Sequence, residues 1–513
     1  MEKHLFLIMT VEQYDTIIIG AGVSGLSCAA HLAKAGKKVI VFEQNKRPGG
    51  YCCSYTRRGL IFDPGAHWII DEHGFNNLLI ELGVDPIEFI QLKAVYRILG
   101  PTKYVDILMS ERELFEKTMR RSFPTVKDST LEELIDLALL LKEEMNTIPT
   151  DSLELLSLFG KVSMGFQMLK KAKNMMKYSK MKLKDFLEEM FPEDEYKDLR
   201  AALHIIPGED ATAIALLIFI ALGISGSAYG PKGGAQQIPD SLARAVKANK
   251  GKIVYSKKVI KINLEDKKVK GVTLDDKTEY FARSVVASID AKQLYYQLLN
   301  PELLPKKLKM RLEKTPISSS WFSVSIVTDL NPADYDFDGT DVLFLNTNDI
   351  VKAGIPNNPE VNGFVAKFNT LHDDSFRTPK ASENYHGIHI LAPATFQHNN
   401  FWRAGPRFNR GKRYEKYKAD YAKILVNRLE NRLPGLSKHI KHMDVSTPLT
   451  YYRYTLNHQG SGLGWQDMIM WKQKISYIKG LYACGMWSFP GPMVEPSIES
   501  GKNAALLVLK NLK

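Results

Sequence analysis

Residues 14–43 constrain the fold of this chain most, because an apolar run, closely spaced glycines and a carboxylate follow one another there. The three isoleucines at 17–19 are typical of a buried parallel strand. Gly20, Gly22 and Gly25 come directly after them. This order predicts a strand, a tight turn and a helix at the start of an α/β fold.

Each glycine of the turn has its own physical role. Gly20 permits the tight turn, Gly22 lets the backbone approach a pyrophosphate, and Gly25 lets the helix pack on the strand. The helix is expected to begin near Ser24, so that its N–H groups and dipole face the phosphates. Glu43 ends the next expected strand, where a carboxylate accepts ribose hydroxyls. These residues predict a dinucleotide site; the alternative is a glycine-rich turn without a nucleotide.

Composition limits the class of protein further. The 513 residues suffice for two domains. The net charge of +12 favours an anionic partner such as a lipid surface, and no nucleic-acid-binding motif accompanies it. The four cysteines have neither a disulfide framework nor zinc spacing, so we expect a reduced compartment and no metal site. The apolar run 5–9 is too short for a signal peptide or a spanning helix, so we expect a cytoplasmic protein.

Several further segments resemble one family of flavoproteins. Residues 43–50 (EQNKRPGG) are similar to the glutamate–arginine–double-glycine signature of amine-oxidase-type flavoproteins. Residues 62–68 (FDPGAHW) resemble the FD-x-G-x-H segment of phytoene desaturases, carotenoid isomerases and retinol saturases. Matching blocks follow, in the same order, at 230–259, 447–464 and 480–501. The chain departs from the amine-oxidase pattern at Tyr51, where an arginine often stands, and at 485–491, where a run of glycines is usual.

The resemblance implies FAD as the cofactor and assigns it a set of residues. The implied FAD-binding residues are Gly20, Gly22, Ser24 and Gly25 at the pyrophosphate, Glu43 at the ribose, Arg47, Gly49 and Gly50 near the phosphates and flavin, Val259 at the adenine, and Gly485 and Val494 at the flavin. The last helix would aim its N-terminus at the flavin, where its dipole favours negative charge.

The resemblance also implies a substrate side. The segment that carries His67 runs beside the flavin in the family, which makes His67 the candidate acid or base; the commoner role of such a histidine is a structural hydrogen bond. Trp68, Tyr229 and Trp487 are candidates for lining an apolar substrate, or else plain core residues. Arg453 is a candidate for orienting substrate or flavin, or for pairing with a carboxylate.

Two segments suggest a lipid-like substrate and a membrane. Residues 213–224 are strongly apolar, as expected for a substrate domain or for a buried helix. Residues 161–184 contain eight lysines and no acid, interleaved with apolar side chains. We expect a basic helix there that contacts an anionic membrane peripherally. The alternative is a solvated lysine-rich helix.

The features combine into one prediction. We expect an α/β fold in which residues 1–75, 226–295 and 476–513 form an FAD-binding Rossmann-like domain, and 76–225 and 296–475 form an inserted α+β substrate domain. Residues 76–225 have a mostly helical pattern, 230–234 a loop pattern and 252–262 a strand pattern.

The predicted activity is FAD-dependent desaturation, saturation or isomerisation of a long apolar polyene, carotenoid or retinoid-like substrate. No second GxGxxG lies between a strand and a helix, so we expect an external electron donor or acceptor. The alternatives are a flavin amine oxidase and, in another class, a prenyl-binding escort protein of the GDP-dissociation-inhibitor type.

Overall fold

The isoleucines near the start of the chain lie at the centre of the first of two large sheets. The structure is a computed structural model that describes residues 12–65, 68–100, 106–147, 152–205, 211–345, 357–466 and 471–512. Strand β1 (Gln13–Ile19) pairs in parallel with β2 (Val39–Phe42) on one side and β12 (Glu279–Ala287) on the other. Ile17 and Ile18 are fully buried there.

The first sheet collects strands from the start, the middle and the end of the chain. Its order is β10-β11-β12-β1-β2-β9, with β18 paired to β12. Its remaining strands are β9 (Lys252–Val254), β10 (Val259–Glu265), β11 (Lys268–Leu274) and β18 (Leu481–Ala483). The strands β9, β2, β1, β12 and β18 pair in parallel and form the part of the sheet that is typical of a nucleotide-binding fold. Parallel sheets of this kind are buried on both faces.

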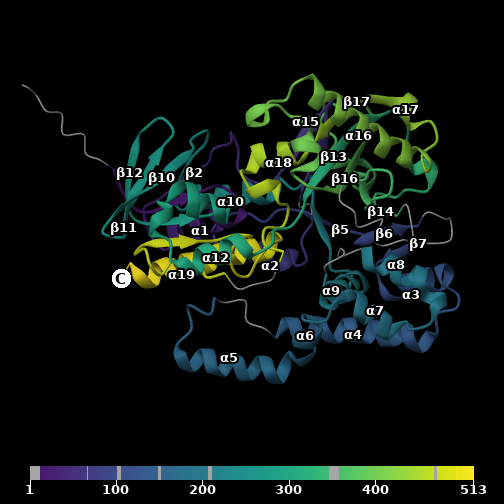
Figure 1. The fold of residues 1–513 in the computed structure, drawn as a ribbon, viewed down its shortest axis with the longest axis horizontal. Coiled ribbons are helices and arrows are strands. Elements are labelled where there is room, and N and C mark those ends of the chain that lie inside the picture. The colour runs from purple at the N-terminus through teal and green to yellow at the C-terminus, as the bar shows by residue number, and fades with distance from the viewer. Residues whose placement is uncertain are drawn as a thin grey trace, which may run out of the picture.

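Three helices cover one face of this sheet. Helix α1 (Val23–Lys34) lies between α10 (Gln237–Ala248) and α19 (Val494–Asn511), as Figure 1 shows. Together with α2 (Glu72–Glu81) they form one apolar core with β1 and β2. Gly501 lets α19 approach closely, because a Cβ at this position would lie 2.1 Å from the carbonyl oxygen of Ser24.

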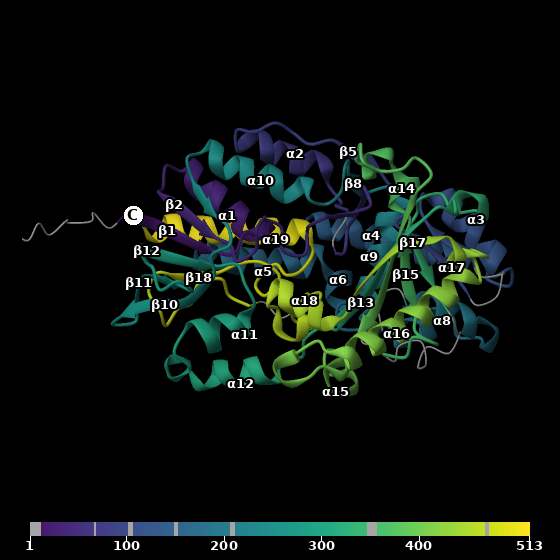
Figure 2. The same cartoon turned by 90° about the horizontal axis from the view of Figure 1, so that it is seen from above.

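The second sheet is mostly antiparallel and has the order β17-β13-β16-β15-β14-β6-β7. Its strands are β6 (Tyr96–Leu99), β7 (Asp106–Met109), β13 (Ser320–Thr328), β14 (Val342–Phe344), β15 (Phe364–Lys367), β16 (His386–Ala394) and β17 (Ile440–Ser446). Figure 2 shows it beside the first sheet, with α16 (Lys412–Glu430) packed on β13 and β16 through an aromatic core. Short helices of the same part are α14 (Asn369–His372), α15 (His398–Arg403), α17 (Leu436–His439) and α18 (Pro448–Thr455). The short helices α11 (Ala291–Gln293) and α12 (Lys306–Lys314) instead pack in a core with β1, β2 and β10 of the first sheet.

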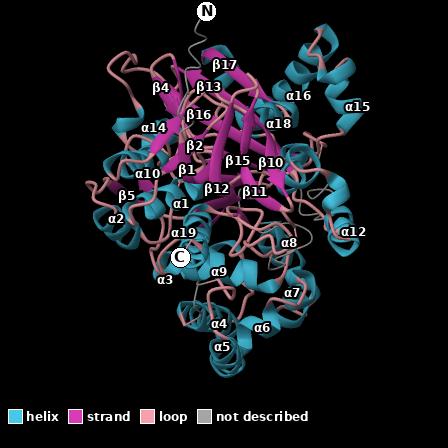
Figure 3. Cartoon of the chain, turned by 90° about the vertical axis from the view of Figure 1, so that its left-hand side faces the viewer, coloured by secondary structure: helices cyan, strands magenta, loops and turns pink. Residues whose placement is uncertain are grey.

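A helical subregion lies beyond the strands, at the lower end of Figure 3. Its helices are α3 (Arg112–Ser122), α4 (Asp128–Asn146), α5 (Leu158–Lys171), α6 (Lys173–Tyr178), α7 (Leu183–Met190), α8 (Lys197–Ile205) and α9 (Ala213–Ile224). The apolar helix α9 packs against α4 and α7 in a core of its own. Two small hairpins, β3 (Tyr55–Arg57) with β4 (Leu60–Phe62) and β5 (Phe89–Gln91) with β8 (Tyr229–Pro231), complete the fold.

The predicted α/β class and the mostly helical pattern of 76–225 are confirmed, and three local predictions are corrected. The mostly helical region 76–225 also contains strands β5, β6 and β7. The predicted loop 230–234 begins inside β8, because β5 pairs with it. The predicted strand 252–262 is two strands, β9 and β10, separated at Ser256, whose φ is +56°.

The basic segment 161–184 was expected to be one helix, and that prediction is wrong. The segment contains most of α5, all of α6 and the first two residues of α7, with breaks at Ala172 and at 179–182. The Glu144 side chain accepts from the backbone N–H groups of Asn174 and Met175, so it caps the start of α6. No helix among the described residues has the length and apolar character needed to span a bilayer.

Candidate active site

The turn between β1 and α1 has the shape of a phosphate cradle. Gly20 has φ of +96° and donates its N–H to the carbonyl oxygen of Phe42, 2.8 Å away. A Cβ on Gly25 would lie 2.1 Å from the Gly20 oxygen, so this contact requires glycine. A Cβ on Gly22, by contrast, would meet nothing closer than the Ser288 hydroxyl at 4.0 Å. The space above Gly22, at the N-terminus of α1, suits an anionic group that approaches the backbone closely.

Glu43 lies at the end of β2 and closes one side of this cradle. Its carboxylate accepts from the backbone N–H of Ala21 at 2.8 Å and from the Asn45 backbone and side-chain N–H groups at 2.8 and 2.9 Å. Burial raises the pKa of Glu43, and these donors oppose that rise. The backbone N–H of Lys257 donates to the Glu43 carbonyl at 2.9 Å, which brings the start of β10, and with it buried Val259, to the same end.

The double glycine runs alongside the cradle. Gly49 donates its N–H to the Ala21 carbonyl oxygen at 2.9 Å, and a Cβ on Gly50 would lie 3.8 Å from the Gly22 Cα. Arg47 is exposed. Tyr51, which stands where the amine-oxidase pattern has arginine, donates its hydroxyl to the carbonyl oxygens of Gly460 and Ser461 at 3.0 and 2.9 Å. In this chain the position therefore joins the double-glycine loop to the 447–464 block.

The C-terminal segment meets the cradle from the opposite side. A Cβ on Gly485 would lie 2.7 Å from the Ser24 hydroxyl, which is itself 2.6 Å from the Ser288 hydroxyl. Gly485 donates its N–H to the Ser500 hydroxyl at 2.9 Å. Val494 is the first residue of α19 and is buried. The predicted pyrophosphate and flavin residues are thus brought together around the N-termini of α1 and α19.

The 62–68 segment is anchored to the same place. Buried Asp63 accepts from the Ser54 hydroxyl at 2.5 Å and from the Ala235 N–H at 3.1 Å. His67 lies outside the described residues. Trp68 and Tyr229 are half-buried, and the backbone N–H and C=O groups of Ile69 and Tyr229 bond reciprocally at 2.9 Å. The two predicted substrate residues therefore lie on paired backbone segments, whereas their side chains pack against different cores.

Glu495 is a site residue that sequence reasoning missed. It lies in the first turn of α19, and its carboxylate accepts from the Ile70 backbone N–H. Burial raises the pKa of Glu495, and the hydrogen bond from Ile70 opposes that rise. This contact links the Trp68 segment to the helix that was expected to face the flavin. The available signal was an acidic residue directly after Val494, where the helix dipole stabilises a carboxylate.

A row of polar residues across the second sheet was also missed. Register places Asp444, Ser325, His389 and Lys367 opposite one another on strands β17, β13, β16 and β15, hence on one face. The Ser325 hydroxyl lies 2.7 Å from His389 Nδ1 and also contacts the Tyr55 hydroxyl.

Lys367 lies at the inner end of this row. Its side chain is buried, and its Nζ donates to the Gly65 carbonyl oxygen at 3.2 Å. Burial lowers the pKa of Lys367, opposed by Asp341 and Asp63. The row therefore leads to the segment that carries His67.

Two predicted substrate residues lie apart from this group. Trp487 packs in an indole cluster with Trp465 at 4.9 Å between ring centres, and its Nε1 donates to the Asn457 side-chain oxygen at 3.0 Å. Arg453 is exposed on α18. Trp487 is therefore a core residue, and Arg453 faces the solvent.

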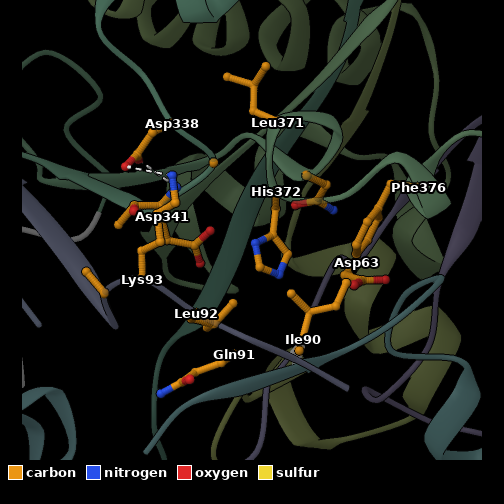
Figure 4. A pocket seen from close by; sticks show the side chains of 15 residues that line it. Asp63, Ile90, Gln91, Leu92, Lys93, Asp338, Asp341, Leu371, His372 and Phe376 are labelled. Carbon is orange, nitrogen blue, oxygen red and sulfur yellow. Dashed lines mark hydrogen bonds and ion pairs between the residues drawn. The ribbon is translucent and has the colours of Figure 1, made fainter. Parts of the chain in front are cut away.

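A cavity of about 220 Å³ with several charged side chains in its lining lies beside Asp63, between β5 and the loop after β15. Figure 4 shows the His372 ring pointing into it, with Asp341 and the Lys93–Asp338 ion pair at its rim. Ligand pockets usually measure about 300–1,000 Å³ and are mostly apolar. This cavity is too small and too charged for a long apolar substrate.

The family model described as "Flavin containing amine oxidoreductase" matches residues 23–327, more than half of the chain. The chain belongs to this family. Its cofactor is FAD, and it is an oxidoreductase of this flavin-dependent class.

Relatives of known name cover most of the chain. A chloroplastic prolycopene isomerase from Daucus carota is 26% identical over 523 residues, covering 98% of this chain and 81% of the relative. An all-trans-retinol 13,14-reductase from Danio rerio is 24% identical over 494 residues, covering 88% of this chain and 78% of the relative. A second Danio rerio protein, named an inactive all-trans-retinol 13,14-reductase, is 22% identical over 466 residues and covers 86% of this chain and 76% of the relative.

Solved structures share the fold. An oxidoreductase from Methanosarcina mazei has a TM-score of 0.60 at 16% identity, covering 96% of this chain and 99% of the other. Putrescine oxidase bound to putrescine has a TM-score of 0.60 at 14% identity, covering 97% and 99%. At these identities the likeness establishes the architecture alone.

The residues present fit FAD. The open space at Gly22 matches a pyrophosphate on the N-terminus of α1. Glu43 and the start of β10 lie together on one side, and Gly485 and Val494 lie at the other. The order of these groups matches the order of adenosine, pyrophosphate and flavin in the dinucleotide.

Proposed function

We propose that this flavoprotein acts on C–C or C=C bonds of a long apolar polyene, a carotenoid or retinoid-like molecule. The observation that carries the proposal is similarity along almost the whole chain to a prolycopene isomerase and a retinol 13,14-reductase. This similarity includes residues 62–68, and the backbone pairing of Ile69 with Tyr229 joins the end of that segment to β8. Trp68 and Tyr229 are both half-buried aromatic residues and are proposed to offer apolar surface to the substrate.

The chain's own residues prepare the site for redox chemistry. Bound FAD supplies hydride exchange with a substrate carbon. The N–H groups at the start of α1 hold the pyrophosphate, and Glu43 accepts the ribose hydroxyls. The dipole at the start of α19 favours negative charge at the flavin end. His67 is proposed to hold or move the proton that accompanies the reaction.

Three reactions use these same parts. Saturation and desaturation need an external electron donor or acceptor, because the sequence has one strand–glycine–helix nucleotide unit. Isomerisation needs none in net terms. We propose that the enzyme works at the cytoplasmic face of a membrane, since a polyene of this kind dissolves there.

The first test is the absorbance spectrum of the purified protein, with identification of the cofactor released on denaturation. Flavin bands and released FAD lead to anaerobic incubations with retinol, cis-lycopene and unsaturated fatty acids, and with putrescine as the amine control. Conversion of a polyene, analysed by chromatography and mass, supports the proposal. Turnover of the amine alone would replace it with an amine oxidase. A colourless protein that does not bind added FAD would contradict the site itself.

A further inference from the structure

Helix α5 turns an apolar face to the solvent. Phe159, Val162 and Phe166 are 83%, 54% and 73% exposed, and their spacing places them on one side of the helix. Among the described residues, no large hydrophobic side chain outside α5 exceeds the 58% exposure of Ile80. Exposed apolar groups gathered in this way mark an interaction site rather than ordinary surface.

The residue on the opposite side of α5 is buried, so the exposed apolar face does not arise from a helix that is rotated the wrong way about its axis. Met164 is on the far side from Phe159 and Phe166 and is buried at 7% exposure. The three exposed apolar side chains therefore lie on one side of α5, and the buried Met164 lies on the other. Figures 1 and 3 both show α5 at the outer edge of the molecule, below α19.

Both ends of this element are tied to the body. Before α5, the Glu154 carboxylate accepts from the backbone N–H groups of Gln473 and Lys474 at 2.8 and 3.2 Å. After it, Glu144 accepts from the N–H of Met175 at 2.8 Å and from the Asn174 side chain at 2.7 Å. The apolar face thus belongs to a supported platform with a fixed place in the fold.

The charge around the apolar face has a single sign. All lysines of the segment are exposed, and within the described part of the chain only the last forms an ion pair, Lys184 with Glu188 at 3.8 Å. The exposed lysines of α5, α6 and the turn that follows are Lys161, Lys170, Lys171, Lys173, Lys177, Lys180 and Lys182. No acidic residue occurs between 161 and 184. An apolar strip within a segment whose charges are all positive is complementary to the acyl chains and anionic headgroups of a lipid bilayer.

We propose that these three apolar residues and the seven lysines form a docking surface for an anionic lipid bilayer, the α5–α6 platform. The side chains of Phe159, Val162 and Phe166 enter the boundary between headgroups and acyl chains, while the lysines meet anionic headgroups. Docking of this kind is peripheral and salt-sensitive. It stands independently of the reaction proposed above, and it would bring the enzyme to a phase in which apolar molecules dissolve.

The test is co-sedimentation of the flavin-loaded, full-length protein with vesicles of phosphatidylcholine plus phosphatidylglycerol, compared with phosphatidylcholine alone. Binding to the anionic vesicles that weakens as salt rises is expected. The double variant Phe159→Asp with Phe166→Asp should bind at least about tenfold more weakly. Ile80→Asp is the matched control, because Ile80 is an exposed apolar residue on α2, and it should bind as the wild type does.

A second pair of variants tests the charge. Replacing Lys170, Lys171 and Lys173 with Gln should weaken binding, whereas the same change at exposed Lys247, Lys306 and Lys307 should not. Flavin absorbance and turnover of detergent-dispersed substrate report that each variant is folded. If the proposed reaction is wrong, turnover is absent while vesicle binding remains, so the two proposals fail separately.

Three outcomes overturn the platform: no binding of the wild type to anionic vesicles, equal binding by the Asp variant, or equal loss in the controls. A wild-type dimer without lipid that becomes monomeric in the Asp variant, measured by light scattering, would assign the surface to a second copy of the chain instead.

Discussion

Replacing Gly22 with alanine should weaken FAD binding while changing the stability of the apoprotein little. The new Cβ would stand 4.0 Å from its nearest protein neighbour, the Ser288 hydroxyl, and the backbone φ of −68° suits alanine. The only expected cost to the apoprotein is a poorer N-cap residue on α1, about 0.5–1 kcal/mol. The methyl group would nevertheless occupy the space into which the pyrophosphate must come.

The loss of FAD affinity can be estimated from the contacts that close approach allows. Displacing the pyrophosphate removes about two hydrogen bonds between backbone N–H groups and charged oxygens, at about 1.5–3 kcal/mol each. The sum of about 3–6 kcal/mol corresponds to at least about a 100-fold weaker Kd. Titration of apoprotein with FAD, followed by flavin fluorescence, measures this directly.

The matched control is Gly411→Ala. Gly411 is also the N-cap residue of a helix, has a similar extended backbone with φ of −82°, and a Cβ added to it would meet no atom within 4 Å. This substitution should cost similar stability and leave the FAD Kd unchanged. Equal FAD affinity in Gly22→Ala and the wild type would refute the placement of the pyrophosphate at this turn.

Three further perturbations test other parts of the structure. Glu43→Ala should lower the unfolding free energy of the apoprotein by about 1–3 kcal/mol in urea melts, because the N–H group of Ala21 loses its buried acceptor; an unchanged midpoint would contradict this. Gly501→Ala should lower the melting temperature sharply, since its Cβ would lie 2.1 Å from the Ser24 carbonyl oxygen; calorimetry showing wild-type melting would contradict the close approach of α19 to α1. Burial raises the pKa of Asp290 from 3.8 to about 6 in the folded protein. A raised folded pKa means that its contribution is fully present below pH 4 and is lost as pH rises through about 6, so wild type should lose about 3 kcal/mol relative to Asp290→Asn between these values. Parallel pH-dependent curves for the two proteins would show that Asp290 titrates normally.

The sequence could predict the elements whose causes are local. The turn from β1 into α1 depends on glycines within a few residues of one another, and both strand and helix lie where they were expected. Helix α10 and strand β11 also have local causes, because a helical apolar period and an alternating strand pattern define them.

The remaining features depend on partners far away in the chain. The polar row of the second sheet exists only through register, which sets Ser325 opposite His389. The break between α5 and α6 depends on Glu144, a residue of α4 that caps α6 through space. Glu495 acquires its role only because Ile70 is folded against it. Such pairings leave no periodic signal in one sequence.

The three-segment first sheet has a consequence for how this protein is made. The Ser27 hydroxyl on α1 bonds to the Ile498 carbonyl oxygen on α19, 471 positions later. At ordinary rates of translation, about 5–20 residues per second, α1 waits roughly 25–95 seconds for that partner. During this interval the nascent chain exposes the apolar side of a finished helix and the unpaired edge of a parallel sheet. Ribosome-associated chaperones would therefore find a target in the β1–α1 unit, and the arrival of α19 would be the step that completes the helical cover of the first sheet.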